Sequence, residues 1–154
     1  MRHSYAIPGS VQIDDKNRPL SEFGKKYLSD LLQKLEVLKS QWDIHLVMYS
    51  PALRTQETMN ALRSFYSLKS SFKEEKLFYT GDLNQIISCL FALENTYETI
   101  LLIGHNPYWE DLASQLTGTK INLEPAQCVF LQKHIDSWCD LFVGGYWDLE
   151  KNIH

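Results

Sequence analysis

Apolar residues recur every three or four positions near the start of the chain, and charged residues fall mostly between them. This spacing places the apolar side chains on one face and predicts an amphipathic helix over about residues 21–39. Ser21 is a residue type that caps helix N-termini, and Pro19 keeps the chain before it extended. The apolar positions are Phe23, Tyr27, Leu28, Leu31, Leu32, Leu35 and Leu38.

Beyond this helix, short apolar runs alternate in single file with helical stretches. At Ser50-Pro51 a run ends where serine can cap a new helix and proline can take its first position. Such alternation favours an α/β fold, a mostly parallel, doubly wound sheet with helices on both faces. The strands expected are Ile44–Tyr49, the short apolar piece Leu77–Tyr79 and Thr99–Ile103, with later helices from about Asp82 to Glu94 and from about Pro107 to Leu116.

The two ends of the chain depart from this alternation. Gln127–Lys133 and Trp138–Val143 are strand-like runs separated by turn-prone residues, which predicts a closing hairpin. At the other end, only Met1 precedes Arg2-His3. The first strand is therefore expected to be short or missing, either vestigial or cut off by a late start of the sequence. With no repeat or linker, a single domain over residues 1–154 is expected.

Composition and charge exclude several classes of protein. The 154 residues include 15 Lys and Arg against 19 Asp and Glu, and the basic residues are scattered, so nucleic-acid binding is not expected. The 3 cysteines lack metal-binding spacing, which indicates reduced thiols and no structural metal. No apolar stretch approaches the ~20 residues of a membrane span, and no signal-peptide pattern is present, so a cytoplasmic protein that does not bind membranes is expected.

Three segments combine a predicted strand end with a cation or an imidazole. They are Arg2-His3, Ser50 to Arg54, and Gly104 to Pro107. Taken singly, a histidine at a strand end is usually structural, Ser-Pro is capping chemistry, and Gly-His-Asn-Pro is a turn. Together, in a parallel sheet, they would converge on one edge, where two arginines and two histidines form an anion site suited to phosphate.

These segments resemble the signatures of the histidine phosphatase superfamily, which includes phosphoglycerate mutases and acid phosphatases. Their order and the short chain are most similar to the SixA-type phosphohistidine phosphatases. Arg2-His3-Ser4 resembles the family's Arg-His-Gly, Arg18 to Gly24 its Arg-Pro-Leu-Thr-x-x-Gly, Ser50 to Thr58 its Ser-Pro-x-x-Arg-x-x-x-Thr, and Ile103 to Pro107 its second histidine motif.

The resemblance implies a role for each residue. His3 would be the nucleophile, forming a phosphohistidine intermediate that water hydrolyses, while Arg2, Arg54 and His105 would bind the phosphoryl oxygens. No metal or other cofactor is implied. Further candidates for substrate binding are Arg18 at the pocket mouth and Ser50 and Asn106 through orienting hydrogen bonds, with solvated, cap and turn roles as the alternatives.

Two departures from the family pattern bear on the substrate. Ser4 replaces the glycine that usually follows the first histidine, which narrows the freedom of that loop. The region from Glu74 to Asp82 shows no match to the carboxylic acid that protonates leaving groups in phosphomonoester enzymes. Phosphohistidine on a partner protein is therefore the favoured substrate. The alternatives are a small phosphorylated molecule or a non-catalytic module that binds phosphate.

Overall fold

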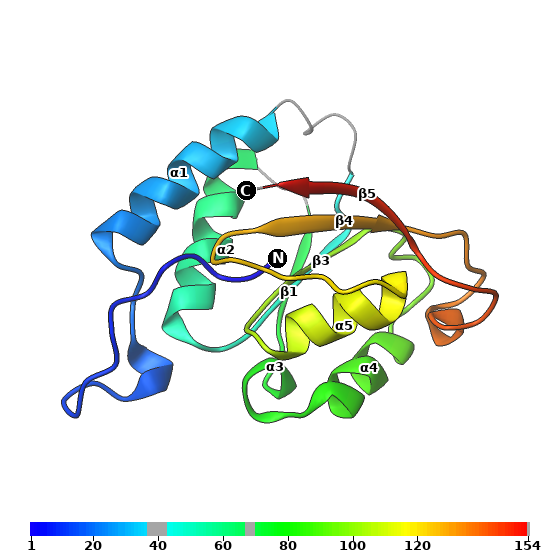
Figure 1. Cartoon of the computed structure of the whole chain (residues 1–154), viewed down its shortest axis with the longest axis horizontal. Coiled ribbons are helices and arrows are strands. Elements are labelled where there is room, and N and C mark those ends of the chain that lie inside the picture. Colours follow the sequence, from blue (N-terminus) through cyan, green and yellow to red (C-terminus); the bar gives the residue numbers. More distant parts are fainter. Residues whose placement is uncertain (37–42, 67–69, 154) are drawn as a thin grey trace.

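The structure is a computed structural model that describes residues 1–36, 43–66 and 70–153 (Figure 1). The end of the first predicted helix, residues 37–39, lies outside these ranges. In chain order the elements are η1 (Asp15–Asn17), α1 (Glu22–Glu36), β1 (Leu46–Tyr49), α2 (Leu53–Tyr66), β2 (Ser71–Glu74), α3 (Leu77–Thr80), α4 (Leu83–Phe91), β3 (Ile100–Ile103), α5 (Tyr108–Thr117), β4 (Cys128–Gln132), η2 (Trp138–Asp140) and β5 (Asp148–Ile153).

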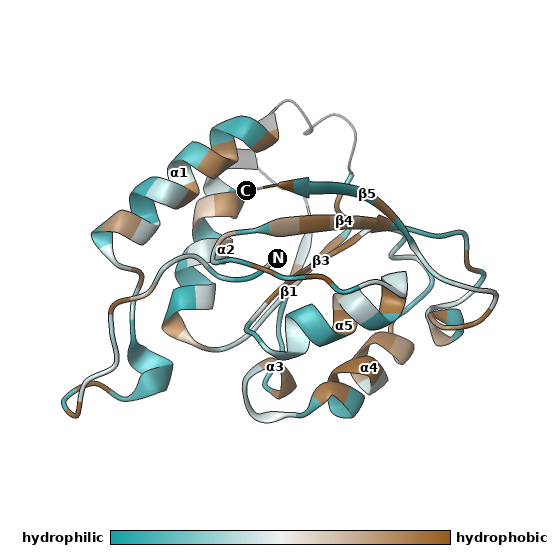
Figure 2. Cartoon of the chain, in the orientation of Figure 1, coloured by the Kyte–Doolittle hydropathy of each residue, from teal (hydrophilic) through white to brown (hydrophobic). Residues whose placement is uncertain are grey.

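The parallel sheet predicted from the sequence is confirmed, with β1 at its centre and β2 and β3 on either side. Alternate side chains of β1 enter opposite layers of core. Val47 packs with the buried faces of α1 and α2, whereas Leu46 and Met48 pack with α4 and α5. Helices therefore cover both faces, and Figure 2 shows their apolar sides turned towards the sheet.

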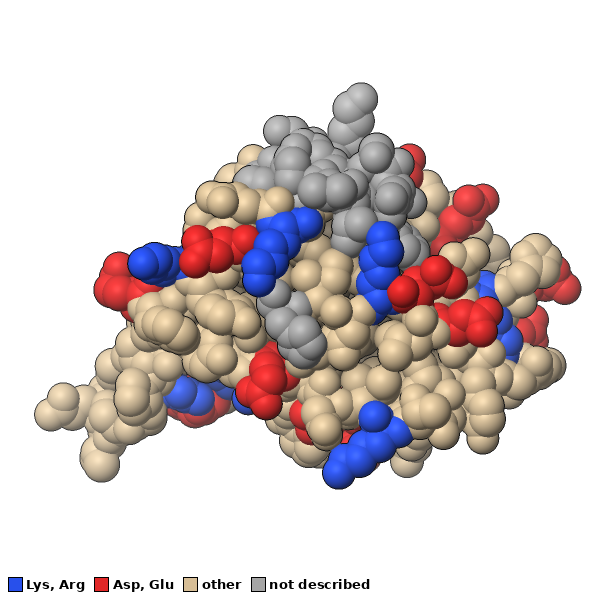
Figure 3. Space-filling model, turned by 45° about the horizontal axis from the view of Figure 1, so that its top comes forward, with Lys and Arg blue, Asp and Glu red and all other residues tan. Residues whose placement is uncertain are grey.

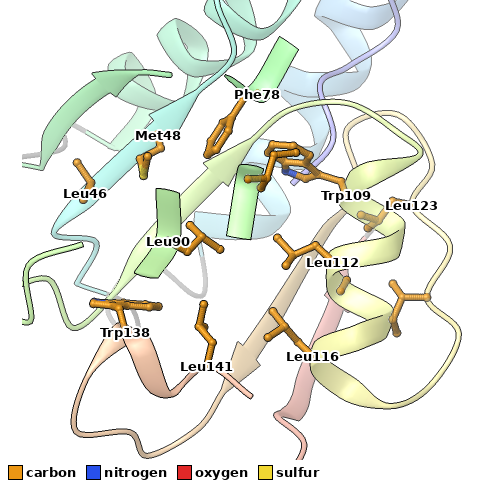
Figure 4. Close-up of a cluster of buried hydrophobic side chains, with 13 residues drawn as sticks. Leu46, Met48, Phe78, Leu90, Trp109, Leu112, Leu116, Leu123, Trp138 and Leu141 are labelled. Carbon is orange, nitrogen blue, oxygen red and sulfur yellow. The ribbon is translucent and has the colours of Figure 1, made fainter. Parts of the chain in front are cut away.

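The core between the sheet and α3, α4 and α5 also fixes a segment next to the strand ends. Phe78 of the four-residue helix α3 is buried and meets the ring of Trp109 edge-on, with 4.9 Å between the ring centroids (Figure 4). A helix this short has little stability of its own. Phe78 anchors it, and this fixes the position of the next residue, Tyr79.

The N-terminal residues join the parallel sheet to an antiparallel ribbon of β4 and β5. Arg2 pairs in parallel with Gly104, and its main-chain N–H donates to the carbonyl of Gln127 at 3.1 Å. The strand expected to be short is thus a single bridge. Beyond Met1, a cavity of about 750 Å³ separates β3 from β4, lined on its two sides by residues such as Leu101 and Val129.

Three expectations are wrong in detail. Leu77–Tyr79 belongs to helix α3, and the strand at this place is β2, whose largely exposed residues carry no apolar signal. Trp138–Val143 is not a strand, because Trp138 and Leu141 lie three residues apart on one side of a turn and are both buried. The partner of β4 is β5. Pro51 precedes α2, which begins at Leu53.

The surface gives further context. On the face shown in Figure 3, acidic and basic side chains of the described residues are interspersed. Within the described ranges, every helix is too short or too polar to cross a bilayer.

Candidate active site

His3 is held in one ring orientation and one tautomer. Its Nδ1 lies 2.6 Å from the carbonyl oxygen of Ser4. Because a carbonyl oxygen only accepts hydrogen bonds, Nδ1 must carry the ring proton. Nε2 then keeps its lone pair, and it accepts a hydrogen bond from Nε of Arg54 at 3.3 Å. Nε2 is therefore unprotonated and faces a guanidinium.

The loop around His3 explains why serine is accepted after it. Ser4 is fully buried, and its hydroxyl donates to the carbonyl of Gly24 at 2.8 Å. Its main-chain N–H donates to the hydroxyl of Thr58. Among the described non-glycine residues, Ala126 alone has a positive φ, so glycine's conformational freedom is not required at position 4.

Glycine is required at position 24 instead. A Cβ atom there would lie 2.0 Å from the carbonyl oxygen of Tyr5. This close approach brings α1 against the loop that carries His3. Ser21 caps α1 as predicted, because its hydroxyl accepts from the N–H of Gly24 at 3.0 Å. The segment from Arg18 to Gly24 thus shapes the site through its backbone.

Arg54 comes from the first turn of α2 and is almost fully buried, with 5% of its surface exposed. Its Nη1 and Nη2 donate to the carbonyl and carboxylate oxygens of Asp15 at 2.7 and 3.1 Å. The same helix turn is tied to the His3 loop by Thr58, whose hydroxyl donates to the Arg54 carbonyl and accepts from Ser4. The arginine and the threonine of the Ser-Pro-x-x-Arg-x-x-x-Thr segment therefore act in one cluster.

His105 follows β3, and its ring centroid lies 4.9 Å from that of His3. Its Nε2 lies 2.8 Å from the hydroxyl of Ser50, which is fully buried. A Cβ at Gly104 would lie 2.4 Å from the ring of Trp109, so glycine lets this turn pack closely before α5. The structure thus brings His3, Arg54 and His105 together where the strands end, and Ser50 orients His105 from within the core.

The side chains of Arg2 and Asn106 both contact one main-chain carbonyl oxygen. Nη1 of Arg2 and Nδ2 of Asn106 both donate to the carbonyl of Leu123, at 2.8 and 2.9 Å. Among the described residues, three buried side-chain nitrogen or oxygen atoms have no hydrogen-bond partner: Nε of Arg2, Nδ1 of His105 and Oδ1 of Asn106. Nε–H of Arg2 can donate a hydrogen bond, and Nδ1 of His105 can do so in one of its two tautomers. Two such donors suit the oxygen atoms of an anion.

Both imidazoles are uncharged at neutral pH. Burial, together with the charges of Arg54 and Arg2, lowers the pKa of His3 from 6.5 to about 4 against the opposing hydrogen bond to Ser4. Burial also lowers the pKa of His105 to about 3, assisted by His3 and Arg54. A neutral imidazole among arginines is a nucleophile in a field that attracts anions.

The rim of the site contains two residues that the sequence pattern did not single out, Asp15 and Tyr79. Asp15 pairs through Oδ1 with Nε and Nη2 of Arg18, at 2.8 and 2.7 Å. The hydroxyl of Tyr79 donates to Oδ2 of Asp15 at 3.0 Å, and its ring lies 5.8 Å from that of His105. Arg18 therefore lies beside the site. The acidic residue three positions before Arg18 is a signal that could have pointed to Asp15.

Among the residues that the structure describes, no group of three or more His, Cys, Asp and Glu side chains is placed to hold a metal ion. The three cysteines are free thiols.

Comparison with known proteins places this geometry in a family. No family model matches the sequence. An uncharacterised chloroplastic protein of Arabidopsis thaliana is 30% identical over an alignment that covers 97% of this chain and 73% of that protein. The chain belongs to the family of this plant protein.

Solved structures identify the fold. A putative phosphohistidine phosphatase SixA from Agrobacterium tumefaciens superposes with a TM-score of 0.83 at 17% identity, over 100% of this chain and 94% of that one. A protein histidine phosphatase SixA complexed with tungstate gives 0.80 at 21% identity, over 99% and 93% of the two chains. The chain has the SixA fold.

A less similar solved structure has the same fold. A mycobacterial glucosyl-3-phosphoglycerate phosphatase gives a TM-score of 0.65 at 13% identity, over 97% of this chain and 94% of that one. The resemblance to the histidine phosphatase superfamily and to its SixA branch is thus confirmed for the fold. His3, Arg54 and His105 lie at one edge of this SixA fold, away from the cavity between β3 and β4, which none of them lines.

Proposed function

We propose that this protein is a phosphatase that removes the phosphoryl group from phosphohistidine on a partner protein, through a covalent intermediate on His3. The observation that carries the proposal is the state of His3, because its unprotonated Nε2 faces Arg54 while Nδ1 donates to the Ser4 carbonyl. Solved proteins with this fold are described as phosphohistidine or protein histidine phosphatases, which supports the same reaction.

The first chemical step transfers the phosphoryl group to His3. The bond between Nε2 and phosphorus forms while the phosphorus–nitrogen bond of the substrate breaks, and the leaving imidazole keeps the electron pair. Arg54, Arg2 and His105 would stabilise the negative charge on the phosphoryl oxygens in the transition state. The carbonyl of Ser4 stabilises the positive charge that the phosphorylated ring acquires.

The second step releases phosphate. Water attacks phosphorus, the bond to Nε2 breaks, and the electron pair returns to the ring while a proton passes from the water to phosphate or solvent. Nε2 is then ready for another cycle. The main-chain N–H of His3 donates to the carbonyl of Gly104, and its carbonyl accepts from the N–H of Ala126. These hydrogen bonds keep the ring in place between the two steps.

The choice of phosphohistidine rests on the carboxylates of the region from Glu74 to Asp82 and on Asp15, each of which has another role. Asp82 caps α4, Glu75 accepts from the N–H of Leu77, and Glu74 accepts from Gln56. Asp15 is ionised at neutral pH, since its pKa lies at about 2. An alkoxide leaves poorly without a proton, whereas a phosphoimidazole can be protonated on its own ring. This difference favours the phosphoramidate.

Kinetics with a series of leaving groups test the substrate class. We expect hydrolysis of a phosphohistidine-bearing protein and of activated aryl phosphates, with kcat/KM falling steeply as the leaving-group pKa rises and alkyl phosphates nearly inert. The series is repeated with Glu74→Gln, Glu75→Gln and Asp82→Asn. Equal turnover of alkyl phosphates, or a selective loss for poor leaving groups in one variant, would reveal a general acid and favour a small phosphomonoester substrate.

Variants of the two histidines test the assignment of roles. His3→Ala removes the nucleophile and should abolish turnover, whereas His105→Ala should leave a residual rate about 10²–10³-fold lower. EDTA should leave the rate of the wild-type protein unchanged. Near-normal turnover by the His3→Ala protein would refute the mechanism. Binding of phosphate without hydrolysis of any substrate would favour the non-catalytic module.

A further inference from the structure

The carboxylate of Asp15 occupies the arginines that an incoming anion would use. Its Oδ2 accepts from Nη2 of Arg54 at 3.1 Å, and its Oδ1 lies 2.7 Å from Nη2 of Arg18. A carboxylate bridging two guanidiniums has the charge and the planar pair of oxygens that these groups recognise in a phosphate. We propose that Asp15 is an internal competitor for these arginines and thereby sets how tightly the site holds free phosphate.

The three nitrogen atoms of the Arg54 guanidinium contact different partner atoms. Nη1 donates to the main-chain carbonyl of Asp15 and Nη2 to its carboxylate, while Nε points to His3. The carbonyl contact is independent of the side chain at position 15. A change of that side chain therefore frees Nη2 for an anion and leaves Arg54 attached to the loop through Nη1.

Exposure shows how the competition can be reversible. The side chain of Asp15 is 54% exposed, whereas that of Arg54 is 6% exposed. An anion that takes over Nη2 lets the carboxylate turn to water, where it is solvated at little cost. Arg54 has no comparable access to solvent. The competition is thus between a fixed cation and a carboxylate that can leave it.

The charge of Asp15 persists over the whole working range of pH. Burial opposes its ionisation, but hydrogen bonds from Arg18 and Tyr79 and the charge of Arg54 outweigh that effect and lower the pKa to about 2. Asp15 is therefore a permanent negative charge at the rim. It repels inorganic phosphate and offsets part of the positive charge of the arginines.

A kinetic consequence follows if the site hydrolyses phosphate compounds, and this part rests on the proposed function. Binding energy that holds substrate and product equally does not raise kcat, and tight product binding slows release. Asp15 would lower the affinity for the product phosphate. Without its charge, KM and the inhibition constant of phosphate should both fall, and kcat should fall with them as release becomes slower.

The chain offers a matched control in the neighbouring residue, Asp14. Its side chain is exposed and does not cap η1, and the side-chain contacts of Arg18 and Arg54 are made to other residues. Asp14→Asn changes the net charge by the same amount as Asp15→Asn, within the same loop. A difference between the two variants therefore reports the contact with the arginines.

Isothermal titration with inorganic phosphate at constant ionic strength tests the proposal. We expect Asp15→Asn to bind phosphate about tenfold more tightly than the wild-type protein, equivalent to about 1.4 kcal/mol, and Asp14→Asn to stay within about twofold of it. Asp15→Ser serves as a second variant that removes the charge, and thermal unfolding verifies that each protein is folded. Equal or weaker phosphate binding by the Asp15 variants, or no binding by any protein, would overturn the proposal.

This titration separates the two proposals. It needs no turnover, so a protein that binds phosphate but hydrolyses nothing would refute the phosphatase while leaving the role of Asp15 measurable. A purely structural role for Asp15 predicts a different change of KM, which would rise while kcat falls. A fall in both KM and the phosphate inhibition constant distinguishes competition from support of the fold.

Discussion

The floor and the rim of the candidate site differ in how they are built. The floor consists of His3, Arg54 and His105, which lie at strand ends or in the first turn of a helix and are held by buried partners. The rim consists of Asp15, Arg18 and Tyr79, which lie on the one-turn helix η1, just after it and on the short helix α3. Asp15, at the centre of the rim, is more than half exposed.

This difference separates two tasks. Groups that stabilise a transition state work best when they need not reorganise during the reaction, and the regular elements beneath the floor provide that rigidity. A group that lets a product leave must be able to move or to yield its partner. The exposed carboxylate of Asp15 can do so. The comparison predicts that changes in the floor reduce kcat by removing transition-state contacts, while changes in the rim act on the affinity for phosphate and, through it, on product release.

The largest expected contrast is between the two arginines that share Asp15. Arg54→Gln should lower kcat by about 10²–10³-fold, because a preorganised donor to the phosphoryl oxygens is lost. Arg18→Gln should lower kcat by less than about tenfold and act mainly on KM. Steady-state kinetics on an activated aryl phosphate measure both. Equal losses of kcat in the two variants would contradict the proposed difference in role between floor and rim.

The floor should also make stability depend on pH. Histidine in the unfolded chain titrates near pH 6.5, whereas the pKa of His3 in the folded protein is lowered to about 4. Between these values the unfolded state binds more protons, so the stability that His3 contributes is fully present above about pH 6.5 and is lost as the pH falls towards 4. The loss is about 3 kcal/mol for a shift of this size.

Urea unfolding at pH 7 and pH 4.5 measures this effect. His3→Gln should lose less stability than the wild-type protein over that interval. The exposed His134 provides a control, and His134→Gln should lose as much as the wild-type protein. If the free energy of unfolding of His3→Gln depends on pH as strongly as that of the wild-type protein, His3 is not a buried, neutral residue in the folded protein.

A smaller effect is expected where α1 meets the loop of the floor. Gly24→Ala would place a methyl group 2.0 Å from the Tyr5 carbonyl oxygen, so the backbone must shift. We expect a loss of at least about 2 kcal/mol in the free energy of unfolding, measured by denaturant titration. Gly9→Ala is the matched control, because a Cβ at Gly9 meets open space and its φ is not positive. A loss no larger than that of the control would contradict the close approach.

The smallest effect is expected from the hydroxyl of Tyr79. Tyr79→Phe removes one hydrogen bond to Asp15 and keeps the ring beside His105. The carboxylate retains its two arginine partners, so kcat should change by less than about threefold while the phosphate inhibition constant shifts slightly. A fall in kcat of more than tenfold would place Tyr79 in the floor, in contact with the reacting group.

The sequence predicted that His3, Arg54 and His105 meet at one edge of the sheet, because these residues follow strong local signals. Arg54 and His105 come after short apolar strands, and parallel strands end at a common edge. That reasoning also located α1, β3, α4, α5 and the capping role of Ser21. Periodicity and caps are local properties, and a single sequence displays them.

Arg18 at the rim was expected from the family resemblance, whereas Asp15 and Tyr79 were not, because no periodic pattern governs their positions. Asp15 meets Arg54 and Tyr79 across 39 and 64 residues of chain. The same limit explains the misplaced strands. β2 and β5 are largely exposed, so their sequences lack the apolar alternation that identifies a strand. Trp138 and Leu141 are buried in the core, and their apolar side chains gave this segment a sequence pattern like that of a strand.

The central claim is that His3 carries the phosphoryl group, and trapping the intermediate tests it most directly. The protein is mixed with a phosphohistidine-bearing protein, quenched within one turnover in alkali, in which phosphohistidine is stable, and analysed by mass spectrometry. The account predicts a phosphoryl group on His3, and neither label nor turnover in His3→Ala. Turnover by the wild-type protein with His3 unmodified, or a label on His105 instead, would contradict it.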